Sequence, residues 1–90
     1  MALEPAAATH GRILIVDDDP LVPKTLRILL RKQGHEVEAA STSAEALRML
    51  ESRPVELVIS DINMPGGDGF QVLAHVKRTY PDTEVILITG

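Results

Sequence analysis

The sequence predicts an α/β domain, a doubly wound parallel sheet with helices on both faces. The first observation is a set of short apolar runs, rich in branched residues, at 12–16, 57–60 and 84–89. Such runs are typical of strands buried on both faces. The second is that stretches with helical spacing separate the runs, and this alternation favours right-handed crossovers between parallel strands. We expect four strands in the order 2-1-3-4, so that the first and third are neighbours.

The composition favours one globular domain and excludes several classes of protein. Ninety residues with 44% hydrophobic content are enough for a single core. A net charge of −4 and only two aromatic residues disfavour direct contact with nucleic acid. The chain has no Cys, which fits a cytoplasmic protein, and no apolar run long enough to span a membrane. Residues 1–11 lack the features of a signal peptide and are expected to form a flexible leader before a domain at 12–90.

The first half of the chain predicts two strands and two helices. The strand at 12–16 leads into an acidic run and then a helix at 21–33, for which Asp19 is a suitable N-cap and Gly34 a suitable C′ residue. A weaker strand with polar alternation follows at 35–39 and is expected at a sheet edge. The next helix starts with a capping box, Thr42-Ser43-Ala44-Glu45, and ends before Pro54.

The second half predicts a strand, a helix and a final strand. The strand at 57–60 is followed by Asp61 and a turn rich in Pro and Gly. Asp68 can cap the helix after this turn, and the glycines of the turn (Gly66, Gly67 and Gly69) are expected to supply left-handed backbone geometry. Helical spacing places Phe70, Leu73 and Ala74 on the buried face of that helix, and the chain closes with a strand at 84–89.

Polar side chains follow three of the predicted strands. Asp17 and Asp18 follow the first strand, Asp61 the third, and Thr89 ends the fourth. The carboxyl ends of parallel strands share one edge, so these residues are expected to meet in one crevice. Carboxylates about 4 Å apart repel by about 4 kcal/mol at an effective dielectric constant near 20, which calls for protonation or a cation. Oxygen ligands suit Mg²⁺, and Asp61 beside it is a plausible nucleophile toward a phosphoryl group.

Each of these residues also has an ordinary structural interpretation. Asp61 can be a strand-end acid that caps a loop or lies in solvent. Asp17 and Asp18 can cap the first helix, although Asp19 is better placed to do so. Thr89 can be a β-branched strand residue and nothing more.

Three motifs together resemble the receiver domain of two-component response regulators. They are Ile-Leu-Ile-Val-Asp-Asp-Asp at 13–19, Asp-Ile-Asn-Met-Pro-Gly-Gly-Asp-Gly at 61–69, and Ile88-Thr89 at the end of a strand. The resemblance covers residues 12–90 and implies a flavodoxin-like fold. It also implies a signalling domain and not an enzyme, which takes a phosphoryl group from a histidine kinase or phosphotransfer protein. The signal would pass to an output domain of transcriptional type.

The resemblance assigns a role to each site residue. Asp61 would be the phosphoacceptor and a metal ligand. Asp18 would bind Mg²⁺ directly, Asp17 would bind it through water, and Asn63 would bind it through its backbone carbonyl. Thr89 would donate a hydrogen bond to the phosphoryl group and act as the switching hydroxyl.

The family pattern continues with a helix, a fifth strand that ends in a Lys, and a last helix, and the 90 residues do not contain them. The fourth strand is therefore expected to form an exposed apolar edge. We expect either a fragment of a longer parent protein or a homodimer.

Two other functions remain open. The first is a pseudo-receiver, an interaction module that is not phosphorylated. The second is a Mg²⁺-dependent phosphohydrolase of the haloacid-dehalogenase type, because Asp17 and Asp19 fit an Asp-x-Asp motif with Thr89 as a later hydroxyl. Pro20-Leu21 stands where that family has Gly-Thr.

Overall fold

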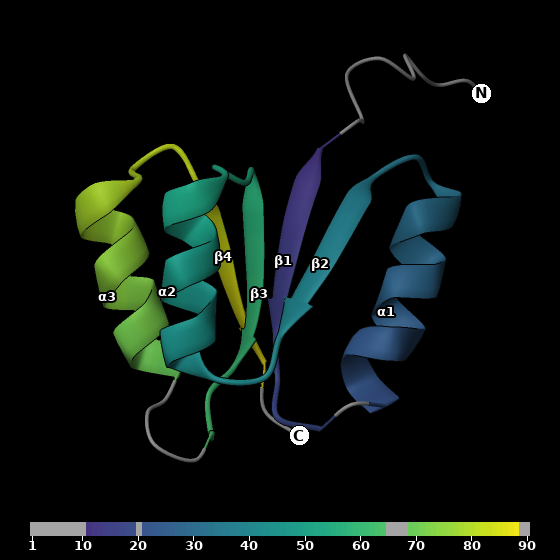
Figure 1. The fold of residues 1–90 in the computed structure, drawn as a ribbon, viewed down its shortest axis with the longest axis horizontal. Helices are drawn as coiled ribbons and strands as arrows, with labels where there is room; N and C mark the ends of the chain where they lie inside the picture. The colour runs from purple at the N-terminus through teal and green to yellow at the C-terminus, as the bar shows by residue number, and fades with distance from the viewer. Residues whose placement is uncertain (1–10, 20, 65–68, 89–90) are drawn as a thin grey trace.

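A computed structural model describes residues 11–19, 21–64 and 69–88, which form a parallel sheet between two layers of helices (Figure 1). The expected leader lies almost wholly outside these residues. The elements alternate as predicted; in chain order they are β1 (Arg12–Val16), α1 (Leu21–Lys32), β2 (Glu36–Ala40), α2 (Ser43–Ser52), β3 (Leu57–Asp61), α3 (Gly69–Thr79) and β4 (Glu84–Ile88).

The sheet has four parallel strands in the order β2-β1-β3-β4, which confirms the predicted fold class and places β2 at an edge. The register aligns the carboxyl ends of the strands. Val16 of β1 lies opposite Ala40 of β2 and Ser60 of β3, and Asp61 lies opposite Ile88 of β4. The residues that follow β1 and β3 therefore leave the sheet side by side.

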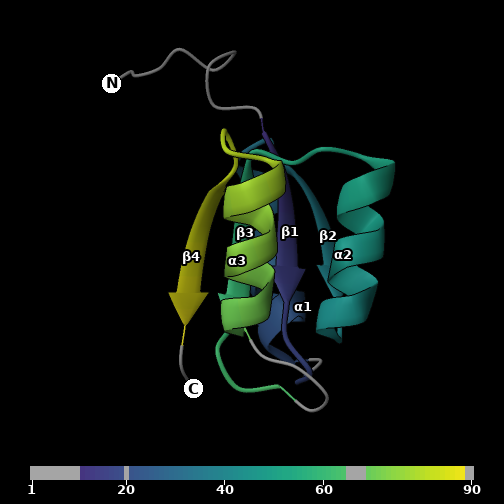
Figure 2. The ribbon, with the colours of Figure 1, turned by 90° about the vertical axis from the view of Figure 1, so that its left-hand side faces the viewer.

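The two faces of the sheet are covered unequally (Figure 2). The face beneath α2 and α3 carries the larger core, whose buried members include Leu14, Leu50 and Val58. The face beneath α1 has a smaller buried core of Ile13, Ile15 and Val37. Ile86 of β4 remains 49% exposed, so β4 forms the apolar edge that we expected.

Both ends of α1 are closed by the predicted residues. Asp19 Oδ1 accepts a hydrogen bond from the Leu21 N–H at 3.0 Å. Gly34 has φ of 95°, its N–H donates to the Arg31 carbonyl, and the next N–H donates to the Leu30 carbonyl. This is a Schellman motif, which requires a residue that tolerates left-handed geometry.

The capping box of α2 is present in a shifted form. Thr42 Oγ1 accepts a hydrogen bond from the Glu45 N–H at 3.0 Å, as predicted. The Glu45 carboxylate accepts from the Ser41 N–H at 2.9 Å, one residue earlier than in the usual box. The side chains still satisfy two backbone donors at the start of α2.

We expect Thr42→Ala to lower the free energy of unfolding by about 1 kcal/mol, because one of these donors loses its partner. Urea denaturation followed by far-ultraviolet circular dichroism measures this loss. Ser52→Ala is the matched control, since the Ser52 hydroxyl bonds an exposed carbonyl at the other end of α2 and should change stability little. Equal losses in the two variants would contradict a capping role.

The predicted buried face of α3 is wrong at Phe70 and Ala74, while Leu73 is half-buried. Phe70 is 54% exposed and Ala74 is exposed, whereas Gly69, Val72 and Val76 are buried. Both sets follow helical spacing, so periodicity alone did not fix the rotation of α3 about its axis. The structure selects the face on which Gly69 allows the helix to approach β3.

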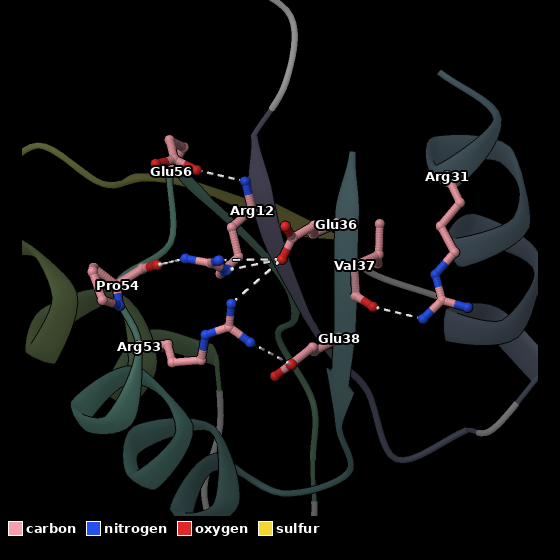
Figure 3. A network of polar contacts seen from close by, with 8 residues as sticks. All are labelled: Arg12, Arg31, Glu36, Val37, Glu38, Arg53, Pro54 and Glu56. Atoms are coloured by element: carbon pink, nitrogen blue, oxygen red, sulfur yellow. Dashed lines mark hydrogen bonds and ion pairs between the residues drawn. The ribbon is translucent and has the colours of Figure 1, made fainter. Parts of the chain in front are cut away.

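A polar network lies at the amino-terminal ends of β1 and β2 (Figure 3). Arg12 and Arg53 both bond Glu36, at 3.2 and 3.5 Å. Arg31 donates to the Val37 carbonyl of β2 at 3.0 Å. Because the Glu36 side chain is 68% exposed, each ion pair contributes less than about 1 kcal/mol.

Within the described part of the chain, no helix is both long and apolar enough to cross a membrane.

Candidate functional site

Three carboxylates come together at the carboxyl edge of the sheet. Asp17 and Asp18 follow β1, and Asp61 is the last residue of β3. One oxygen of each side chain lies within 4.8 Å of the others. The geometry follows from the parallel pairing of β1 with β3, in which Val16 lies opposite Ser60 and the next residue of each strand carries an acid.

The three acids differ in exposure and in electrostatic environment. Asp17 is 5% exposed, Asp61 is half-buried and Asp18 is exposed. Burial raises the pKa of Asp17, and the negative charges of Asp61 and Asp18 raise it further, while a hydrogen bond from the Asp19 N–H at 2.8 Å partly offsets the rise. Asp17 therefore lies where negative charge is poorly compensated.

Asp61 is held by hydrogen bonds on both sides of its backbone. The Ile62 N–H donates to the Ile88 carbonyl of β4 at 2.9 Å, and the buried Ser60 hydroxyl donates to the Asp61 carbonyl at 3.1 Å. Asp61 Oδ1 accepts from the Asn63 N–H at 3.2 Å. These contacts define the position from which the carboxylate projects.

Of the two other predicted site residues, the structure describes Asn63 but not Thr89. Asn63 is exposed, and its N–H is engaged with Asp61. Thr89 lies outside the described residues, although its predecessor Ile88 is the register partner of Asp61.

Two contributors to the site were missed at the level of sequence. A cavity of about 240 Å³ opens beside the acids and is lined by Asp17, Asp18, Arg27, Ala39, Ala40, Ser41 and Glu45. Among these residues, Arg27 of α1 is half-buried. The second is Gly69, where an added Cβ would lie 2.5 Å from the Asp61 carbonyl oxygen. The only signal for Gly69 was its place in the motif at 61–69, where we expected conformational freedom.

The chemistry of the donor set fits a small hard cation. All three side chains offer oxygen atoms, which Mg²⁺ and Ca²⁺ prefer over nitrogen or sulfur. The exposure of Asp18 leaves room for the water ligands that Mg²⁺ retains. Burial and the nearby carboxylates of Asp61 and Asp18 raise the pKa of Asp17, so a bound cation would stabilise the ionised form of this cluster.

Comparison with known proteins identifies relatives of the whole described region. A family model for the response regulator receiver domain matches residues 13–90. Transcriptional regulatory protein GlrR of Escherichia coli is 42% identical over 80 residues, which cover 89% of this chain and 18% of that protein. Response regulator protein FleR of Pseudomonas aeruginosa is 40% identical over 80 residues, which cover 89% of this chain and 17% of that protein. The chain thus spans less than a fifth of the length of these curated relatives.

A solved structure gives the same result for the fold. Response regulator protein TrrA from Thermotoga maritima, in complex with Mg(2+)-BeF, matches with a TM-score of 0.81 and 38% identity, covering 87% of this chain and 68% of that chain. The match of the family model over almost all of the chain, together with this likeness, shows that the chain belongs to the receiver-domain family of two-component response regulators.

Proposed function

We propose that this chain is a phosphoacceptor domain that takes a phosphoryl group onto Asp61 in a Mg²⁺-dependent reaction. The observation that carries the proposal is the convergence of Asp17, Asp18 and Asp61, with oxygen atoms within 4.8 Å of one another. The donor would be a phosphohistidine of a histidine kinase or of a phosphotransfer protein in the cytoplasm. The TrrA structure, a complex with Mg(2+)-BeF, supports the choice of metal.

The acids and one backbone group would hold the metal. Asp18 would bind it directly, Asp17 through a water molecule, Asp61 through one carboxylate oxygen and Asn63 through its carbonyl. When bound, Mg²⁺ would neutralise the negative charge that develops on the transferring phosphoryl oxygens. The exposure of Asp18 and the burial of Asp17 agree with a direct ligand at the solvent side and a supporting ligand behind it.

The reaction is a transfer between two nucleophiles. A carboxylate oxygen of Asp61 attacks the phosphorus atom, and an O–P bond forms while the P–N bond to the donor imidazole breaks. The electron pair of that bond remains on the imidazole nitrogen. With a proton on its other ring nitrogen, the donor leaves as a neutral histidine. Among the described residues, the hydrogen bond from the Asn63 N–H engages Oδ1, which favours Oδ2 as the attacking atom.

Phosphorylation of Asp61 would change the contacts at the end of β4 and, through them, the rest of a longer parent protein. Thr89 would donate its hydroxyl to the phosphoryl group, a role supported by the pairing of its neighbour Ile88 with Asp61. Residues 12–90 would form the receiver part and pass the change to an output domain. The relative GlrR, a transcriptional regulatory protein of which this chain matches 18%, supports a transcriptional output.

The test is to incubate the 90-residue chain with MgCl₂ and acetyl phosphate and to measure its intact mass. We expect an adduct of one phosphoryl group in the wild-type chain and in Asp82→Asn, whose exposed carboxylate lies in the loop before β4. Asp61→Asn should give no adduct, because the amide is not a nucleophile. EDTA should abolish the adduct in every variant.

Other outcomes would favour other functions. Folded wild-type protein that gives no adduct would point to a pseudo-receiver. Continuous release of inorganic phosphate that survives Asp61→Asn and is lost in Asp17→Asn would point to a phosphohydrolase.

A further inference from the structure

We propose that Gly69 is a positioning residue for the Asp61 carboxylate. Its missing side chain lets the first residue of α3 lie directly against the peptide group of Asp61. The inference rests on the proposed function of Asp61. It states that Gly69 helps to fix the position of the Asp61 carboxylate, although Gly69 itself would contact neither the metal nor the phosphoryl group.

The contact leaves no space for a methyl group. A Cβ at Gly69 would lie 2.5 Å from the Asp61 carbonyl oxygen, 3.1 Å from the Asp61 carbonyl carbon and 3.1 Å from the Ile62 Cα. All three are backbone atoms, so relief requires the end of β3 or the start of α3 to move. A carbon atom meets its neighbours favourably at about 3.5–4.0 Å, which sets the displacement at about 1 Å.

Close approach, and not backbone conformation, is what requires glycine here. Among the described glycines only Gly34 has a positive φ. Gly69 is the first residue of α3, where an L-residue is well tolerated. This result corrects the expectation that Gly69 supplies left-handed geometry.

Neither the start of α3 nor the end of β3 can move easily to relieve this contact. The Gly69 N–H donates to the Ile62 carbonyl at 3.0 Å, which ties α3 to the turn after β3. Val72 and Val76 are 0% exposed and anchor α3 to the larger core. On the other side, the Ile62 N–H bonds the Ile88 carbonyl and holds the end of β3 against β4.

The displaced atoms belong to the residue that carries the reacting group. Asp61 presents both the carbonyl that Gly69 touches and the carboxylate that lies within 4.8 Å of the other acids. A shift of its peptide group would also disturb the hydrogen bond from the Asn63 N–H to Oδ1. We therefore expect a methyl group at position 69 to spread the three carboxylates apart.

The test compares Gly69→Ala with Gly34→Ala in the 90-residue chain. Gly34→Ala is the matched control, because its positive φ makes alanine destabilising while its position at the opposite edge, beside Arg12 and Glu36, leaves the acids untouched. Calorimetric titration with MgCl₂ gives the dissociation constant, and the amide chemical shifts of Asp61 and Asn63 in EDTA report local geometry. We expect Gly69→Ala to weaken Mg²⁺ binding about tenfold, the effect typical of groups that orient metal ligands, and to move both shifts. Gly34→Ala should do neither.

Wild-type Mg²⁺ affinity and wild-type shifts in folded Gly69→Ala would overturn the inference. If Gly69→Ala is unfolded in buffer, both variants are titrated in sucrose, which favours the folded state. A variant that stays unfolded there would also overturn it, since Gly69 would then be required for folding as a whole. Failure of the proposed function is a separate result: the wild-type chain would bind Mg²⁺, respond to Gly69→Ala in this way, and still take no phosphoryl adduct.

Discussion

Leu14→Ala is expected to lower the free energy of unfolding by about 3 kcal/mol, the usual size of a buried leucine truncation. Leu14 is 1% exposed and lies at the centre of the sheet, between Glu38 of β2 and Val58 of β3. Its side chain belongs to the larger core beneath α2 and α3. That core contributes much of the free energy of folding, because the opposite face of the sheet is only partly covered. A domain of this size buries a limited fraction of its surface, so the loss of one core side chain matters.

The matched control is Ile86→Ala, which removes a branched apolar side chain from the uncovered part of the sheet. Ile86 is 49% exposed, so its truncation should lower the free energy of unfolding by less than about 1 kcal/mol. Urea denaturation of both variants measures the difference. If Ile86→Ala proves as costly as Leu14→Ala, β4 must be covered in solution, and light scattering would show whether a second copy of the chain covers it.

The architecture was predictable because its signals are local and repeated. A continuous branched apolar run such as 13–16 is typical of a buried strand, and parallel pairing then brings the ends of β1 and β3 together. This topological rule predicts that Asp17, Asp18 and Asp61 lie near one another, as they do in the structure. Strand limits shifted by one residue, as in β2 at Glu36–Ala40, because backbone hydrogen bonds and not side chains decide them.

The features that could not be predicted from the sequence depend on contacts between helices and strands. The rotation of α3 buries Gly69 against the Asp61 peptide group, and a glycine gives no signal in a hydrophobic pattern. Helical spacing placed Phe70 on the buried face, yet its side chain is 54% exposed. No motif marks Arg27 as part of the site, and the packing of α1 against β2 brings it to the cavity beside the acids.

Asp17→Asn is expected to have opposite effects on stability with and without Mg²⁺. Burial raises the pKa of Asp17 in the folded chain, and Asp61 and Asp18 add to this rise. A carboxyl with a raised folded pKa contributes stability below its unfolded pKa of about 3.9, and this stability is lost as the pH rises through the folded value. At pH 7.5 in EDTA the variant should therefore be more stable than wild type by at least about 1 kcal/mol, the repulsion that one like-charged neighbour about 4 Å away would cause even in bulk water. At low pH the two should converge.

Saturating Mg²⁺ should reverse this order. A ligand at 100 times its dissociation constant stabilises the folded state by about 2.7 kcal/mol, and a variant that binds weakly gains little of it. Urea midpoints at pH 7.5 in EDTA and in MgCl₂ measure both effects, with Asp82→Asn as a control that should follow wild type in each. An Asp17→Asn chain less stable than wild type in EDTA would mean that the hydrogen bond from the Asp19 N–H outweighs burial and repulsion. If wild type is the less stable chain in EDTA and the more stable one in MgCl₂, the Asp17 carboxylate lowers the stability of the metal-free fold. The bound cation then offsets this loss of stability.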